Sequence, residues 1–243
     1  MVSGLSGVDW TVLAVAALLV GFAKTSIGGV GAISVALFAA VLPARESSGA
    51  LLPLLIAGDV LAIRAYRRHV EWPALFRLFP SVAVGVLAGT AFIAWVDDTV
   101  MRRTIGATLL AVVAIHLWQR RRPANPSGRW QALVFGLLAG FTTMVANAGG
   151  AVMALYLLSK GYQKLAFLGT AAWFFFIVNL FKVPFSASLG LISADSLTLN
   201  AALLGAVLLG AVAGRATIRR LDQKRFERLV LLFTVVSSVN LLR

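Results

Sequence analysis

Long apolar runs, separated by short polar or glycine-rich breaks, follow one another along the whole chain. Reading these runs against Gly, Pro and charged residues predicts a series of helical pieces and an all-α protein. The predicted pieces cover about 10–22, 28–42, 47–66, 74–96, 101–119, 130–143, 147–158, 165–183, 196–214 and 226–242.

The pieces fall into two sets of five, divided by the polar linker 120–129. Each set opens with two short pieces around a glycine-bearing break. Several positions match between the sets, at separations of 119 or 125: Gly21 with Gly140, Gly31 with Gly150, Gly85 with Gly210, Gly89 with Gly214 and Asp97 with Asp222. We therefore expect a single domain over 1–243, built from two repeats at about 8–119 and 130–243.

Composition places these helices in a membrane. Hydrophobic residues make up 60% of the chain and charged residues 13%, whereas a soluble domain has roughly 45–50% and 25%. The net charge of +13 lies between the apolar runs, where membrane topology places Lys and Arg, so nucleic acid is not expected as a partner. We expect a multi-pass protein of the cytoplasmic membrane, with the lipid bilayer as partner and no cofactor.

The distribution of positive charge bears on how each broken pair crosses the membrane. If both pairs are re-entrant, one side collects 16 of the 22 Lys and Arg residues and the other side 5, with Lys24 in the first break. If each pair crosses once, the two sides receive 10 and 11. Because cytoplasmic loops carry the excess of Lys and Arg, the uneven partition is favoured. It predicts two inverted repeats, each a re-entrant broken helix pair followed by three transmembrane helices.

The first break contains a lysine, two hydroxyls and several glycines inside an apolar run. One helix over 10–42 would be about 50 Å long, beyond a hydrocarbon core of roughly 30 Å, so two shorter helices fit better. A helix beginning near Gly28 offers free N–H groups at its positive end, which favours an anion. Candidate ligands of that anion are Lys24, Thr25, Ser26, Gly28, Gly29 and Gly31. The alternative is an ordinary kinked helix whose Lys24 reaches the membrane surface.

The second break supplies hydroxyls and an amide where the first supplies a lysine. Its candidate binding residues are Thr142, Thr143, Asn147 and Gly149. Asn147 is also well placed to cap the helix that follows, and the two roles are compatible.

A third candidate region lies in the apolar run 169–184. Asn179 and Lys182 are three residues apart and share one helix face, and Trp173 lies further back. Polar side chains within a span usually face the bundle interior or a water-filled cavity. The alternatives are that Lys182 reaches the surface at a helix end near Pro184, and that Trp173 only packs.

Asp59 is the most deeply placed of the nine acidic residues. A carboxylate there could exchange a proton, which makes Asp59 a candidate for proton coupling. The alternative is a structural partner for Lys24 or for a backbone N–H. The chain has no H-E-x-x-H, G-x-S-x-G or Walker A motif and no cysteine, so we do not expect an enzyme or a metal site.

Three blocks, at 21–31, 142–150 and 169–184, together with the loop 66–72, resemble the TauE/SafE family of membrane transporters. The resemblance runs nearly end to end. It implies transport of sulfite or small organosulfonates. Where many members carry a G-x-G-G-G run, this chain has Gly29-Val30-Gly31-Ala32. We expect a secondary transporter working by alternating access; the alternatives are an anion channel or a transporter of another small carboxylate or oxyanion.

Overall fold

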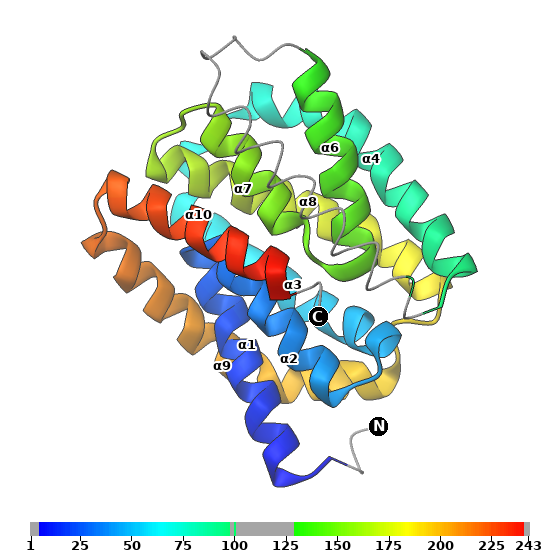
Figure 1. Cartoon of the computed structure of the whole chain (residues 1–243). Helices are drawn as coiled ribbons and strands as arrows, with labels where there is room; N and C mark the ends of the chain where they lie inside the picture. Colours follow the sequence, from blue (N-terminus) through cyan, green and yellow to red (C-terminus); the bar gives the residue numbers. More distant parts are fainter. Residues whose placement is uncertain (1–4, 98–99, 101–128, 241–243) are drawn as a thin grey trace.

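The computed structural model describes residues 5–97, 100 and 129–240, and every regular element within them is helical (Figure 1). The first half contains α1 (Gly7–Thr25), the 3-10 turn η2 (Gly28–Val30), α2 (Gly31–Val41), α3 (Ala44–Tyr66), the 3-10 turn η3 (Arg67–His69) and α4 (Trp72–Trp95). The second half contains α6 (Arg129–Ala146), α7 (Gly149–Ser159), α8 (Lys164–Ser188), α9 (Ala194–Arg220) and α10 (Gln223–Asn240). The all-α class is confirmed; the predicted helix 101–119 lies outside the described residues.

Within the described part, five helices are long and apolar enough to cross a membrane: α1, α3, α4, α8 and α9. The shorter apolar helices include α2 and α7, each of which follows a break. This set agrees with the multi-pass membrane protein that composition predicts.

Both predicted breaks are present, a few residues later than expected. α1 continues to Thr25, so Lys24 lies in its last turn and not in the break, and α6 continues to Ala146. The start of α1 is fixed by a capping box, in which the side chains of Ser6 and Asp9 bind each other's backbone N–H.

The predicted end of α8 near Pro184 is wrong, because this helix continues to Ser188 with Pro184 inside it. A proline removes only one backbone hydrogen bond, and membrane helices tolerate this where neighbouring groups compensate.

The two halves pack on each other through two pairs of helices. The first helix of each half packs on the fourth helix of the other: α1 on α9, and α6 on α4 (Figure 1). Glycines permit this close approach, because a Cβ on Gly21 would overlap the carbonyl of Val207, and one on Gly210 would overlap that of Leu18. The α4–α6 interface repeats the arrangement, with Gly85 and Gly140 each against a backbone carbonyl of the other helix. Two of the glycine pairs matched by sequence, Gly21 with Gly140 and Gly85 with Gly210, therefore occupy equivalent interfaces.

Contacts along these interfaces give the helix directions. α1 and α9 run parallel, since Gly210 lies at Leu18 and Gly214 at Phe22. α3 and α8 run antiparallel, since Gly49 lies at Leu191 whereas Gly169 lies at Tyr66. These directions are compatible with inverted repeats; the assignment of membrane sides stays a prediction.

The breaks of the two halves meet near α3 and α8. The turn η2 contacts both α7 and α10, and a Cβ on Gly150 would lie 3.6 Å from the carbonyl oxygen of Gly28. The fold thus brings together two interrupted helices that are far apart in the sequence.

Candidate functional site

A cavity lies where the two breaks meet α3 and α8. Its volume, measured as the space open to the centres of water-sized molecules, is about 80 Å³. One water needs roughly 10–15 Å³ on this measure, so the cavity has room for a small polyatomic ion. Most of its wall is apolar or glycine, and the polar lining residues are Lys24, Ser26, Asp59, Thr143, Asn147 and Asn179.

Lys24 and Asp59 form an ion pair at this cavity, with 2.7 Å between Nζ and Oδ1. The Lys24 side chain is 13% exposed and that of Asp59 1%. Gly58 makes room for the lysine, because a Cβ there would lie 2.9 Å from Lys24 Cγ. The lysine Nζ also lies 4.4 Å from the ring centroid of Phe175. Lys24 therefore points into the protein and does not reach the membrane surface.

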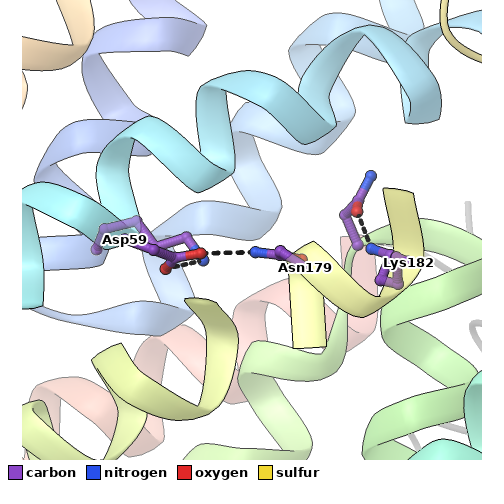
Figure 2. Close-up of polar contacts among 5 residues, drawn as sticks. Asp59, Asn179 and Lys182 are labelled. Carbon is purple, nitrogen blue, oxygen red and sulfur yellow. Dashed lines mark hydrogen bonds and ion pairs between the residues drawn. The ribbon is translucent and has the colours of Figure 1, made fainter. Parts of the chain in front are cut away.

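Asn179 joins this pair from α8. Its Nδ2 donates a hydrogen bond of 2.7 Å to Asp59 Oδ2, and the residue is 1% exposed (Figure 2). Asp59 and Asn179 are 120 residues apart, close to the separations of 119 and 125 between the positions matched by sequence. The two halves thus meet in a polar contact at the cavity.

Lys182 lies one turn further along α8 and is 1% exposed (Figure 2). Its Nζ donates to the backbone oxygen of Thr143 and to Asn147 Oδ1, both at 2.6 Å. Among the described residues, Lys182 has no carboxylate at ion-pair distance. The alternative that Lys182 reaches the surface at a helix end is wrong, because α8 continues to Ser188 and the lysine is buried within it.

Asn147 links three elements and does not cap α7. The N-cap of α7 is Ala148, which makes no side-chain capping bond, so that prediction for Asn147 is wrong. Asn147 adopts a φ of +52°, the left-handed conformation that Asn tolerates better than most residues. With this backbone conformation, Asn147 Nδ2 donates to Ser48 O at 3.0 Å, while Asn147 Oδ1 accepts from Lys182 Nζ. The backbone conformation of Asn147 thus directs its side-chain amide toward α3 and α8 and away from the N-terminus of α7.

Several predicted site residues do not line the cavity. Thr25 Oγ1 binds the carbonyl oxygens of Gly21 and Ala211, at 3.0 and 2.9 Å, and so faces α9. The hydroxyl of Thr142 donates to the backbone of its own helix at Leu138 O, at 2.7 Å.

Two further candidates are also absent from the cavity wall. Gly149 packs against Thr143, where a Cβ would approach within 2.8 Å of Thr143 Cβ. Trp173 packs on Trp72, with 5.2 Å between the ring centroids. Of the predicted glycines, Gly28 and Gly31 line the cavity and Gly29 lies within η2.

Sequence reasoning missed two residues that shape the site. Phe175 precedes Asn179 by four positions and therefore shares its helix face, a signal that was available. Ser48 carried no such signal, because only the packing of α3 against the second break brings it to Asn147.

Comparison with known families gives one result. A family model described as Sulfite exporter TauE/SafE matches residues 13–241. The chain belongs to the TauE/SafE family. TauE/SafE proteins are a family of membrane transporters and not of enzymes, and this member is a multi-pass membrane transporter. No curated protein and no solved structure matches the chain.

Proposed function

We propose that this TauE/SafE protein transports sulfite or an organosulfonate through the cavity between its two halves. The observation that carries the proposal is the charge at and next to the cavity. Lys24 and Asp59 line the cavity, and Lys182 binds two of its lining residues, Thr143 and Asn147, so these three charged groups have a net formal charge of +1. Buried charges are costly unless compensated, and a bound anion would compensate this one.

The two breaks support an anion in a second way. α2 and α7 both start at the breaks, and neither has a side-chain capping bond at its N-terminus. Helix N-termini present free N–H groups and a partial positive charge. Gly28 and Gly31 at one break and Gly150 at the other line the cavity, so backbone can approach a ligand closely there.

The position of the cavity supports alternating access. Secondary transporters commonly place the substrate at the interface of two repeats, between half-helices, and expose it by rocking one part against the other. Here the contact between Asp59 and Asn179 crosses the boundary between halves. For Asp59 we propose proton coupling: a proton taken by its carboxylate would weaken the ion pair with Lys24 and loosen this boundary. The alternative function is an anion channel.

The proposed sidedness puts the linker 120–129 and the end of α9 in the cytoplasm, following the excess of Lys and Arg. Single cysteines near Asn125 and Arg220, in a chain that has none of its own, should both be protected from an impermeant thiol reagent added to intact cells. Labelling of the Arg220 position from outside would contradict the inverted arrangement.

Transport is tested with purified protein in liposomes. We expect saturable uptake of sulfite that accumulates against its own gradient when a proton gradient is imposed. A panel of sulfite, sulfate, thiosulfate, sulfoacetate and taurine would define the substrate. Strictly downhill flux that does not respond to any ion gradient would favour the channel, and absence of any protein-dependent flux would contradict both functions.

A further inference from the structure

Asn179 has a polar atom that no group in the described part of the chain satisfies. Its Nδ2 donates to Asp59 Oδ2. An ionised carboxylate only accepts hydrogen bonds, so the amide nitrogen must face Asp59 and the amide oxygen must face elsewhere. That oxygen, Oδ1, is buried and accepts no hydrogen bond from the described residues. A buried acceptor without a donor is unfavourable, so Oδ1 is suited to a donor on a ligand.

The charged residues around Asn179 indicate which charge that ligand carries. The residue lines the cavity, and the charges of Lys24, Asp59 and Lys182 leave one positive charge uncompensated. A monoanion would neutralise this site, whereas a dianion would leave a negative charge in a mostly apolar cavity.

Lys182 does not line the cavity itself, but the two residues that it binds, Thr143 and Asn147, do. An ammonium has three N–H donors, and the structure gives Lys182 two acceptors, Thr143 O and Asn147 Oδ1. Residues three apart on a helix have Cβ atoms about 5–6 Å from each other, so the Lys182 ammonium adds positive charge close to Asn179 on the same helix (Figure 2).

We propose that the site selects a monoanion that carries its own hydrogen-bond donor, and that Asn179 Oδ1 accepts from that donor. Hydroxyalkanesulfonates and O-protonated hydrogensulfite belong to this class, whereas the sulfite dianion and simple alkanesulfonates do not. The inference rests on the proposed anion-binding function and adds a requirement to it.

The test compares isethionate with propane-1-sulfonate in calorimetric titrations of the purified protein. Both are monoanions with the same number of non-hydrogen atoms, and a hydroxyl in one replaces a methyl in the other. An apolar wall alone would favour the methyl group. With Asn179 accepting from the hydroxyl, we expect isethionate to bind about tenfold more tightly, or about 1.4 kcal/mol.

Equal or tighter binding of propane-1-sulfonate would overturn the inference and leave anion binding intact. Binding of sulfite without binding of isethionate would overturn it as well. Failure of sulfite and both sulfonates to bind would instead contradict the proposed function on which the inference rests.

Two variants connect the preference to Asn179. Asn179→Leu removes the amide and should reverse the preference in favour of propane-1-sulfonate. Leu168→Met changes another cavity-lining residue of α8 without adding or removing a strong hydrogen-bonding group, and it should keep the preference for isethionate. If both variants lose the preference for isethionate, the preference depends on the shape of the cavity wall and not on a hydrogen bond to Asn179, which would contradict the inference. The comparison of the two ligands on the unmodified protein does not depend on either variant folding.

Discussion

The two halves of this transporter share a helical frame but carry different charges where their helices break. In the first half, the last turn of α1 before the break carries a lysine that is paired with a carboxylate, Lys24 with Asp59 at 2.7 Å. The second break has only neutral groups, and two of its oxygens bind Lys182 of α8. The charge of Lys24 is therefore compensated by Asp59, whereas no carboxylate in the described part of the chain lies at ion-pair distance from Lys182. The comparison teaches that Lys24, the lysine that the sequence places at a helix break, is already paired, and that Lys182 is the better candidate to attract an anion.

The largest effect is expected from breaking the pair in the first half. Lys24→Gln leaves Asp59 as a buried carboxylate without its cation, which typically costs about 3–5 kcal/mol of folding stability. Thermal and denaturant unfolding of the purified protein in detergent would measure the loss.

A double variant controls for this loss. Lys24→Gln with Asp59→Asn removes both charges, keeps the net charge of the site and should recover most of the stability. If the double variant is as unstable as the single one, the ion pair does not account for the effect. If the single variant is fully stable, Lys24 and Asp59 are not coupled.

The next effect concerns the second half. Lys182→Met removes the uncompensated charge, and losing a buried charged partner usually weakens binding by about 2–5 kcal/mol. We therefore expect sulfite affinity to fall at least thirtyfold, about 2 kcal/mol, in calorimetric titrations. Lys224→Met makes the same substitution at an exposed lysine of α10 and should leave the affinity unchanged. Equal losses in the two variants would mean that overall charge, and not Lys182, attracts the anion.

The smallest effect is expected from the glycines of the α1–α9 and α4–α6 interfaces, which the two halves have in common. Gly210→Ala and Gly85→Ala place a methyl group against a backbone carbonyl in the α1–α9 and α4–α6 interfaces. Each should cost about 1–3 kcal/mol in unfolding measurements, and the two losses should be similar. Gly205→Ala, in α9 with nothing within 4 Å of the added atom, should be neutral or stabilising. A loss at only one interface would contradict their equivalence.

Much of the frame could be predicted from the sequence, because apolar periodicity and glycine breaks are local signals. They identified the all-α membrane class and both broken helices, while the equivalent interfaces of the matched glycines Gly21 with Gly140 and Gly85 with Gly210 came from the structure. Helix ends were predicted less accurately: the sequence pattern predicts a helix end just before Pro184, whereas α8 continues to Ser188. Whether a proline ends a membrane helix depends on neighbouring groups that a local pattern does not contain.

The sequence by itself determined which polar groups lie in the apolar runs: Lys24, Asp59, Asn179 and Lys182 are all buried or nearly so at the junction of the halves. Only the tertiary structure decided which of them pair. Asp59 lies 35 residues from Lys24 and 120 from Asn179, and Asn147 contacts Ser48 across 99 residues. Electrostatic compensation depends on distances of a few ångströms, which packing of the halves sets and residue type does not.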